Sequence, residues 1–307
     1  MGVRFRGWGI AVPDRVVTND ELSKTLDTSD EWITERTGIR ERRIGGSSRT
    51  LGGLAAQRAM DDAGVSPADI DFLILATTTP DRVVPATAPM LATDIGLTCP
   101  AMDLNAACSG FMFALRTAEG LLETGNKRVL VVGAEHLSRW VDWEDRNMAV
   151  LLADGAGATV LEYDEGDSDI LSFSLGTNGE WADLLTCEHG GYIQMDGKEV
   201  FRRAVRVVVS SAEEALAKAG VTPDELSLVI PHQANIRIIQ AACQRLGVDM
   251  ERAVVVLDRY GNTSSASIPL AVADAIDNGR VKPGDLALLT GFGAGMTWAS
   301  AVVRWSP

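Results

Sequence analysis

The sequence predicts an α/β protein built from two similar halves. Residues 63–74 and residues 219–230 align without a gap at an offset of 156, about half of the 307-residue chain. Continuous apolar runs such as residues 128–133 and 285–290 are typical of strands covered on both faces, and they alternate with helical patterns. Two such halves packed through their helices would form five layers, helix, sheet, helix, sheet and helix, with mixed, mostly parallel sheets.

The two aligned segments share one local signature. Each begins at the end of an alanine-rich helix, turns through a glycine and a proline, and enters an apolar run of β-strand character. A polar turn follows each run, at residues 77–80 in the first segment and residues 231–235 in the second. Loops at equivalent strand ends of the two halves are therefore expected to meet.

Two further matches follow in the same order, with changed loop lengths. Residues 103–108 match residues 257–262, and residues 154–161 match residues 291–298. Three matches in one order predict a duplication. We expect one half to span residues 1–164 and the other to span residues 165–307.

Composition and charge narrow the class of protein. The chain is 46% hydrophobic and 23% charged, which is the composition of a soluble globular protein with a sizeable core. No apolar stretch approaches the length of a membrane span, and the N-terminus lacks the pattern of a secretory signal. A net charge of −14 argues against nucleic acid as a partner. The four cysteines have neither metal-ligand spacing nor a disulfide framework, so we expect a reducing, cytoplasmic setting and no metal.

Cys108 stands where a predicted strand turns sharply into a helix. Small residues surround it, Ala106 and Ala107 before and Ser109 and Gly110 after, so the backbone can turn tightly and a substrate can come close. A thiol at a helix N-terminus faces unpaired N–H groups, which favour the thiolate. These features indicate a nucleophile that carries an acyl group, and the alternative is a buried core cysteine.

His232 and Asn262 are candidates for the same site. His232 ends a predicted strand and precedes a helix that begins at Ile236, unlike His136 and His189, which we interpret as structural or solvated. Alone, each would pass for a hydrogen-bonded turn residue. Together with a cysteine nucleophile, they would supply two neutral donors to the enolate oxygen that forms when a second substrate loses CO2.

Six motifs in order carry a resemblance to a known family. They resemble those of the β-ketoacyl-acyl-carrier-protein synthase III family of the thiolase superfamily, nearly from end to end. The motifs are residues 28–42, 107–111, 154–158, 231–235, 258–264 and 291–298.

The resemblance implies a thiolase-like fold and a decarboxylative Claisen condensation. An acyl-CoA starter would form an acyl-cysteine, which condenses with a malonyl-acyl-carrier protein to give a 3-oxoacyl-acyl-carrier protein, the initiation of fatty acid synthesis. The implied enzyme is an acyltransferase and a homodimer, with no cofactor beyond its acyl-CoA substrate.

The resemblance also assigns residues. It implies Cys108 as the nucleophile, His232 and Asn262 as the decarboxylation pair, and the backbone N–H groups of Cys108 and Ala294 as the oxyanion hole. Coenzyme A would contact Trp32 and Arg146 around its adenine, Arg36 at its phosphates, and Thr28, Phe201, Ala234 and Asn235 along its pantetheine arm. Val84 and Met195 would line the acyl pocket, Val84 from across the dimer interface.

Two positions depart from the common family pattern. Ala294 stands where glycine is frequent, and a positive φ there would cost ~1 kcal/mol. Val84 stands where several relatives carry a larger aromatic residue, so acyl chains beyond acetyl, or branched ones, are expected to fit.

A cationic stripe is the candidate docking surface for the acidic carrier protein. Lys198, Arg202 and Arg206 recur every four residues, which places them on one face of a helix. Arg237 begins the next predicted helix and would extend the stripe. The alternative is an ordinary solvated face.

Related enzyme classes differ in their catalytic residues. A thiolase needs a second catalytic cysteine near the C-terminus, and none follows Cys243. Elongating synthases use a second histidine where Asn262 stands, and plant-type polyketide synthases are longer chains. The runner-up is a starter-unit ketosynthase or acyltransferase of a specialised polyketide-type pathway. From another class, a catalytically silent carrier-binding subunit remains, against which the intact Cys108, His232 and Asn262 argue.

Overall fold

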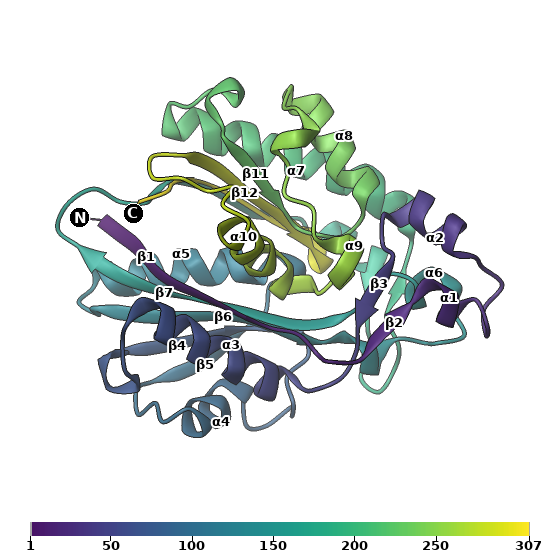
Figure 1. Cartoon of the computed structure of the whole chain (residues 1–307), viewed down its shortest axis with the longest axis horizontal. Helices are drawn as coiled ribbons and strands as arrows, with labels where there is room; N and C mark the ends of the chain where they lie inside the picture. Colours follow the sequence, from purple (N-terminus) through teal and green to yellow (C-terminus); the bar gives the residue numbers. More distant parts are fainter. Residues whose placement is uncertain (1, 307) are drawn as a thin grey trace.

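Two β-sheets, each drawn from its own part of the chain, form the framework of the computed structural model, which describes residues 2–306 (Figure 1). The five strands of the first sheet lie in the spatial order β1 (Gly2–Ala11), β7 (Asp154–Asp164), β6 (Arg128–His136), β4 (Phe72–Ala76) and β5 (Ala101–Leu104). The four strands of the second lie in the order β11 (Leu228–Pro231), β12 (Leu286–Gly293), β13 (Thr297–Arg304) and β8 (Ile170–Thr177).

The sheets are mixed, as predicted, but parallel pairs are not the majority. Only β4 with β5, β4 with β6, and β11 with β12 are parallel. The other four pairs within these two sheets are antiparallel. The apolar runs were misleading on this point, because antiparallel strands covered on both faces are apolar throughout as well.

Helices separate and cover the two sheets in the five predicted layers (Figure 1). The buried middle layer is α5 with α10, and both helices contact strands of both sheets. The layers of helices are α3 (Ser48–Ala63) and α4 (Thr87–Asp94) outside the first sheet, α5 (Gly110–Glu123) and α10 (Ser267–Asp277) between the sheets, and α7 (Gly197–Ala219) and α8 (Ile236–Leu246) outside the second.

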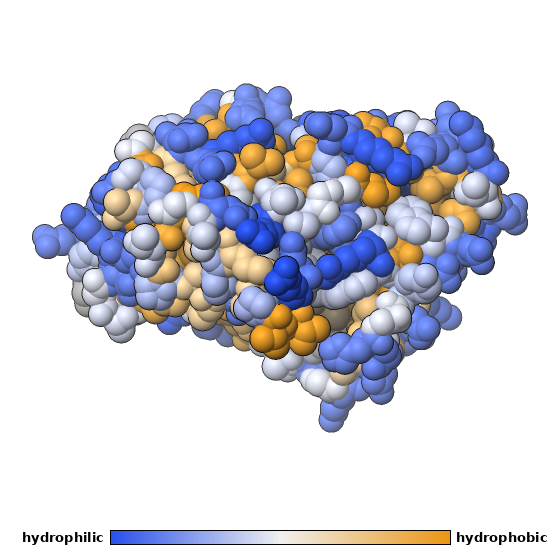
Figure 2. All heavy atoms as spheres, turned by 90° about the horizontal axis from the view of Figure 1, so that it is seen from below, coloured by the Kyte–Doolittle hydropathy of each residue, from blue (hydrophilic) through white to orange (hydrophobic). Residues whose placement is uncertain are grey.

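Core and surface follow from this layering. The largest apolar cluster joins side chains of α5 and α10 to both sheets, including Phe111, Leu115, Ile268 and Leu289. Seen from the side of α3 and α4, the surface is mostly hydrophilic, with apolar groups interspersed (Figure 2). None of the helices within residues 2–306 has the length and apolar character that crossing a membrane requires.

Short elements and turns complete the chain. Most of them lie in the connections around the strand ends that carry the site. They are β2 (Val16–Thr18), β3 (Glu41–Arg43), β9 (Leu185–Thr186), β10 (Gln194–Met195), α1 (Asn19–Leu22), α2 (Asp30–Thr37), α6 (Arg146–Ala149), α9 (Leu257–Tyr260), and the 3-10 turns η1 (Pro67–Asp69), η2 (Ala107–Ser109), η3 (Leu137–Trp140), η4 (Gly179–Leu184), η5 (Pro223–Glu225), η6 (Met250–Arg252), η7 (Ser264–Ala266) and η8 (Ala294–Met296).

The aligned segments adopt the same backbone conformation in both halves. Gly64 ends α3 with φ 66° and ψ 30°, and Gly220 ends α7 with φ 67° and ψ 29°. Each is followed by a 3-10 turn with a capping box, η1 and η5. The match at an offset of 156 is therefore structural as well as sequential.

The other two sequence matches were wrong in register. Ala107 and Ser264, both with φ 49°, begin equivalent turns, η2 before α5 and η7 before α10. Cys108 therefore corresponds to Ser265, and Asn105 corresponds to Asn262. The sequence match failed because α9 is inserted between the strand-like segment 253–256 and its turn. Likewise, residues 154–161 begin β7, whereas residues 291–298 run from β12 into β13.

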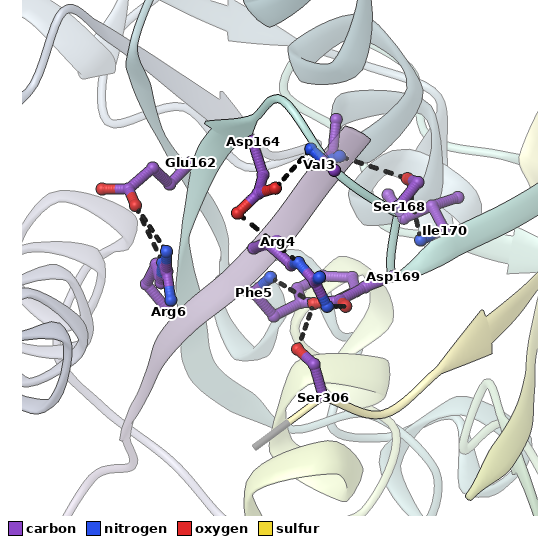
Figure 3. A network of polar contacts seen from close by, with 11 residues as sticks. Val3, Arg4, Phe5, Arg6, Glu162, Asp164, Ser168, Asp169, Ile170 and Ser306 are labelled. Carbon is purple, nitrogen blue, oxygen red and sulfur yellow. Dashed lines mark hydrogen bonds and ion pairs between the residues drawn. The ribbon is translucent and has the colours of Figure 1, made fainter. Parts of the chain in front are cut away.

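Polar contacts fasten the N-terminal strand to the segment that joins the two halves (Figure 3). Asp169, only 2% exposed, accepts hydrogen bonds from Arg4 Nη1 at 2.9 Å, from the Phe5 N–H at 2.9 Å and from Ser306 Oγ at 2.8 Å. One buried carboxylate thus connects β1, the connection into β8 and the C-terminal end of the chain.

Candidate active site

Cys108 lies in the strand-to-helix turn that the sequence predicts. Strand β5 ends at Leu104, and α5 begins at Gly110. Ala107 has a positive φ of 49°, a strained conformation that costs ~1–3 kcal/mol for a residue with a side chain. Ser109 Oγ and Thr297 Oγ1 hold the turn by donating to the Ala106 carbonyl at 2.8 and 2.9 Å. The second half of the chain therefore helps to fix the position of the cysteine.

The ionisation of Cys108 differs from the sequence-based expectation of a thiolate. Burial raises the pKa of its thiol to about 12, and the negative charge of Glu135 acts in the same direction. The neighbouring Ser264 hydroxyl acts in the other direction and lowers the pKa of the thiol. Desolvation outweighs any help from the helix N-terminus, so the resting residue is a thiol and its nucleophilic form requires a proton acceptor.

His232 is a neutral donor in this structure. It follows β11, is 3% exposed, and burial lowers the pKa of its imidazole to about 3. Its Nδ1 lies 2.6 Å from Ser267 Oγ, which also accepts from the Gln233 N–H at 3.4 Å. We assign the Ser267 proton to the bond with Nδ1, which leaves the proton of the ring on Nε2 as a donor.

Asn262 is oriented by its own turn. Its Oδ1 accepts from the Ser264 N–H at 2.9 Å, and its backbone N–H donates to the Leu151 carbonyl at 2.9 Å. Because the oxygen of the amide is engaged, its Nδ2 group is left to donate to a substrate. Asn262 lines the same cavity as Cys108.

Gly293 allows the last loop to approach the cysteine backbone. A Cβ at Gly293 would stand 2.6 Å from the Cys108 nitrogen and 2.9 Å from the Ala107 Cβ, closer than atoms can pack. Ala294 follows and lines the cavity, and it is not among the residues with positive φ, so the strain considered from the sequence is absent. The loop therefore packs directly against the Cys108 backbone, and Ala294 and Cys108 line the same cavity.

Backbone strain is concentrated at this site. Within residues 2–306, the non-glycine residues with positive φ are Ala107, Ser264 and Met296. They stand beside Cys108, beside Asn262 and beside Ala294, respectively. Such strain persists only where surrounding contacts enforce it, and it is typical of functional sites.

A cavity of about 930 Å³ opens above Cys108. Met195 lines it, together with Leu137, Met148 and Leu152 from the connection between β6 and β7. Val84 does not line it and is 82% exposed, whereas its neighbour Val83 does line it. None of the seven residues expected to contact coenzyme A lines this cavity.

The expected coenzyme A residues gather around α2. Trp32 stacks against two guanidinium groups, with the Arg146 carbon 4.6 Å and the Arg36 carbon 4.9 Å from its ring centroid. Thr28 precedes this helix, and its buried hydroxyl has no hydrogen-bond partner in residues 2–306. Helix α2 ends against α8, whose N-cap is Asn235, preceded by Ala234.

The expected docking residues are exposed on two adjacent helices. Arg202 and Arg206 lie on α7, and Arg237 lies on α8 with its guanidinium carbon 5.6 Å from the Phe201 ring centroid. Arg202 is paired with Glu199 at 2.7 Å, whereas Arg206 has no ion-pair partner within residues 2–306. Arg237 extends the stripe beside Phe201, and Arg202 is the one of these three arginines that an ion pair compensates within residues 2–306.

Sequence reasoning missed Glu135 and Ser264. Glu135 is fully buried near the end of β6, where burial raises the pKa of its carboxyl, and Ser264 donates to it at 3.1 Å and lines the same cavity as Cys108. A carboxylate directly after the apolar run 129–134 was the available signal. Within residues 2–306, no group of three or more His, Cys, Asp or Glu side chains could hold a metal ion.

The duplicated five-layer fold, with a cysteine at the start of one buried helix and a histidine and an asparagine from the other half, defines an enzyme of the thiolase superfamily. Two family models match the chain, 3-oxoacyl-[acyl-carrier-protein] synthase III over residues 102–179 and its C-terminal part over residues 216–305. The chain belongs to the β-ketoacyl-[acyl-carrier-protein] synthase III family.

Curated relatives and solved structures agree with this membership. The β-ketoacyl-[acyl-carrier-protein] synthase III of Roseiflexus sp. is 47% identical and covers 98% of this chain and 97% of its own length. The crystal structure of 3-oxoacyl-[acyl-carrier-protein] synthase III from Aquifex aeolicus superimposes with a TM-score of 0.97, at 46% identity over 99% of this chain and all of that one. The priming β-ketosynthase of the R1128 polyketide pathway has a TM-score of 0.94 at 38% identity, covering 99% and 96% of the two chains.

Proposed function

We propose that this protein is an acyltransferase that condenses an acyl-CoA starter with malonyl-acyl-carrier protein to begin fatty acid synthesis, without a cofactor. The observation that carries the proposal is that Cys108, Asn262 and Ala294 line one cavity, and that the neutral His232 and the Cys108 backbone both pack against Gly291. A nucleophile, an oxyanion loop and two neutral donors are the groups that this reaction needs.

The first half-reaction acylates Cys108. Its sulfur attacks the thioester carbonyl of the acyl-CoA, and the N–H groups of Cys108 and Ala294 stabilise the oxyanion of the tetrahedral intermediate. Coenzyme A leaves as the thiol. The acyl chain then occupies the apolar cavity that Met195 lines.

The second half-reaction forms the carbon–carbon bond. The malonyl group loses CO2, and its thioester oxygen becomes an enolate held by His232 Nε2–H and Asn262 Nδ2. The enolate carbon attacks the acyl-cysteine and expels the sulfur of Cys108. Because the pKa of His232 is about 3, its donor stays neutral across the physiological range and is not lost by titration.

Coenzyme A would enter beside α2. Its adenine would stack between Trp32 and Arg146, with Arg36 at the phosphates and Thr28, Phe201, Ala234 and Asn235 along the pantetheine arm. A ring between Trp32 and Arg146 needs ~7 Å of separation, two stacking distances, so Arg146 would swing away from its present position at 4.6 Å.

A homodimer in a reducing cytoplasm is part of the proposal. The edge of β5 is free in the first sheet, and it runs directly into the Cys108 turn. Val83 and Val84, 84% and 82% exposed, would be covered by a second copy, where Val84 would border the partner's acyl pocket. All four cysteines are free, which suits a reducing compartment.

A starter-unit ketosynthase of a specialised pathway is the second candidate. The large apolar cavity favours it, because a site for acetyl alone needs far less volume. The carrier protein would dock on Arg202, Arg206 and Arg237 in either case.

Mass spectrometry of the intact protein tests both candidates. The protein is exposed to acyl-CoAs of increasing length and branching, and malonyl carrier protein is then added. We expect an acyl adduct on Cys108 that disappears as the 3-oxoacyl carrier protein forms. Preference for a long or unusual acyl group would favour the second candidate, and failure of every acyl-CoA to label Cys108 would overturn both.

A further inference from the structure

Arg42 is a buried cation to which the two half-reactions above give no role. It lies on β3 and has no solvent exposure. Its guanidinium makes three hydrogen bonds within residues 2–306, and all of the acceptors are carbonyl oxygens. Nη1 donates to the Val17 carbonyl at 3.1 Å, and Nη2 donates to Asn19 Oδ1 at 2.8 Å and to the Val150 carbonyl at 2.9 Å. The side chain therefore connects β3 to β2, to the start of α1 and to the end of α6.

A buried arginine is a destabilising way to fill this space. Burial lowers the pKa of the Arg42 guanidinium to about 10, so the side chain is still a cation at neutral pH. Its buried Nε–H has no hydrogen-bond partner within residues 2–306, and an unpaired buried donor is unfavourable. An apolar side chain of similar volume would avoid both penalties. What an apolar side chain cannot do is bind several acceptors in fixed directions, which is the property of the planar guanidinium.

Asn19 extends the contact from Arg42 to α2. Its amide oxygen accepts from Arg42, so its amide nitrogen is free to donate elsewhere. Asn19 Nδ2 donates to Asp30 Oδ1 at 2.8 Å and to the Ile39 carbonyl at 2.8 Å. Asp30 is the first residue of α2, and Ile39 follows the C-cap of that helix. Both ends of α2 are therefore fixed to the guanidinium through one side chain, which is 1% exposed.

Arg42 also satisfies the end of α6. This helix has only four residues, and the carbonyls at a helix end have no partner in a following turn. Val150 is the C-cap, and its carbonyl is the one that accepts from Arg42. At the other end, Asp145 caps the helix by accepting from the Asn147 N–H at 2.9 Å. Because a helix of one turn is marginal by itself, the contacts at its two ends hold it in place.

These two helices carry the pair of residues that would enclose the adenine of coenzyme A. Trp32 lies on α2, and Arg146 begins α6, with its guanidinium carbon 4.6 Å from the Trp32 ring centroid. The Arg146 side chain must swing away to admit a ring, so the backbone of α6 has to set the spacing. Arg42 contacts that backbone directly and contacts α2 through Asn19.

We propose that Arg42 is a positioning residue that fixes the separation of α2 and α6 and thereby holds Trp32 and Arg146 ready for the adenine of an acyl-CoA. This inference rests on the proposed function. Asn262 is held separately, by backbone hydrogen bonds with Leu151 and Ala153 at 2.9 Å each. The effect of Arg42 should therefore be confined to the step that uses coenzyme A.

Arg42→Met tests the proposal, because methionine keeps a long unbranched apolar stem but has no donor. With acyl-CoA, acylation of Cys108 should show a KM about tenfold higher, the size of one lost stacking contact, and a nearly unchanged kcat. With acyl-pantetheine, which is the same thioester without the adenine, kcat/KM should not change. A merely structural role would lower the folded fraction instead and slow both reactions equally. Release of the free thiol measures both reactions.

Arg4→Met is the matched control. Arg4 donates to the buried carboxylate of Asp169 at 2.9 Å, near the chain termini and on the opposite side of the molecule from α2 and α6 (Figure 1). The variant makes the same chemical change, so it should lower the thermal stability without changing the KM for acyl-CoA. If Arg42→Met does not fold, as judged by thermal unfolding, Asn19→Ala replaces it. That variant cuts the connection to α2 while Arg42 keeps its two bonds to backbone carbonyls.

The outcomes separate the positioning role from the proposed function. A raised KM for acyl-CoA with unchanged acylation by acyl-pantetheine, in Arg42→Met or Asn19→Ala but not in Arg4→Met, supports the positioning role. An unchanged KM for acyl-CoA, an equal loss with both thioesters, or the same rise in Arg4→Met would overturn it while wild-type Cys108 is still acylated. Absence of any acyl adduct on wild-type Cys108 would instead remove the proposed function, and the positioning role with it.

Discussion

Two turns share one backbone conformation but carry different side chains. They lie at residues 105–110 and 262–267. In each, an asparagine Oδ1 accepts the N–H two residues later, at 3.1 Å for Asn105 and 2.9 Å for Asn262. The residue two positions after each asparagine, Ala107 or Ser264, has φ 49° and begins a 3-10 turn before a buried helix. Duplication thus placed two equivalent turns in contact, and they differ in that Cys108 of one corresponds to Ser265 of the other.

The strands beneath the turns show the same division. Register with the neighbouring strand makes Glu135 at the end of β6 equivalent to Gly293 at the end of β12. Glu135 reaches across to Ser264 and Ser265 of the opposite turn. Gly293 has no side chain, so the backbone of the Cys108 turn comes within contact of it. The first half therefore places a buried carboxyl group at this position, whereas the second half has a glycine that lets the backbone of the Cys108 turn approach.

The largest expected effect concerns the nucleophile itself. Cys108→Ala should abolish acyl-enzyme formation while leaving the fold intact, because it removes one sulfur atom. Mass spectrometry of the intact protein with acyl-CoA measures the adduct. Cys187→Ala is the matched control, since Cys187 also lines the cavity and is exposed. Peptide mapping that finds the acyl group on Cys99, Cys187 or Cys243 would contradict the assignment.

The next largest effect should separate the decarboxylation step from the acylation step. His232→Ala and Asn262→Ala should slow malonyl decarboxylation by ~10²–10³-fold, the cost of one lost oxyanion donor. Acylation of Cys108 should suffer much less. Release of CO2 and release of coenzyme A, measured separately, check this. If Asn262→Ala slowed decarboxylation and acylation equally, the two turns would not serve different steps of the reaction.

Glycine variants in β12 probe the backbone access. Gly293→Ala forces its Cβ against the Cys108 nitrogen, so we expect acylation to fall at least tenfold and unfolding free energy to drop by ~1–3 kcal/mol. Gly291→Ala is the matched control, because the nearest atoms to its Cβ would be Ile268 Cδ1 at 3.3 Å, His232 Cβ at 3.5 Å and the Cys108 carbonyl oxygen at 3.8 Å, all without overlap. Urea unfolding and acylation rates measure both, and equal behaviour of the two variants would count against the close approach.

The dependence of stability on pH compares the buried groups directly. His232 has a pKa of about 3 in the folded protein and 6.5 as its ordinary value, so between these values the unfolded chain binds more protons. Stability should therefore fall as the pH decreases below 6.5, by ~1.4 kcal/mol per pH unit. Glu135 has a raised pKa, so its contribution has the opposite sign and falls as the pH rises above 4.5.

Variants isolate the histidine contribution. His232→Asn should flatten the acid side of the stability profile in urea unfolding experiments, whereas His189→Asn should not, because His189 is exposed. A profile that keeps its slope in His232→Asn would mean that another group takes up the proton on unfolding.

The smallest expected effect concerns docking on the second half. Arg206→Glu should raise the KM for malonyl carrier protein several-fold, more at low salt than at high salt, because screened charges steer encounter. Lys218→Glu, the same charge change at the far end of α7, is the control. The KM for acyl-CoA should change little in both. If Arg206→Glu left the KM for malonyl carrier protein unchanged at low salt, the stripe would be an ordinary solvated surface and not a docking site.

Local patterns made much of this protein predictable. The signature at residues 63–74 and 219–230 determined equivalent helix ends, 3-10 turns and strands, because glycine, proline and capping residues act on the backbone nearest to them. The small residues around Cys108 likewise predicted its turn. His232 at a strand end and the helix from Ile236 followed from the same short-range rules.

Tertiary structure alone decided the rest. Whether Cys108 is a thiol or a thiolate depends on how much water surrounds it, and no local pattern records that. The contact between Glu135 and Ser264 joins residues 129 positions apart, and the register that equates Asn105 with Asn262 became visible only once α9 was seen as an insertion. Desolvation and long-range contact are properties of the packed chain, and they determine the proton chemistry of this site.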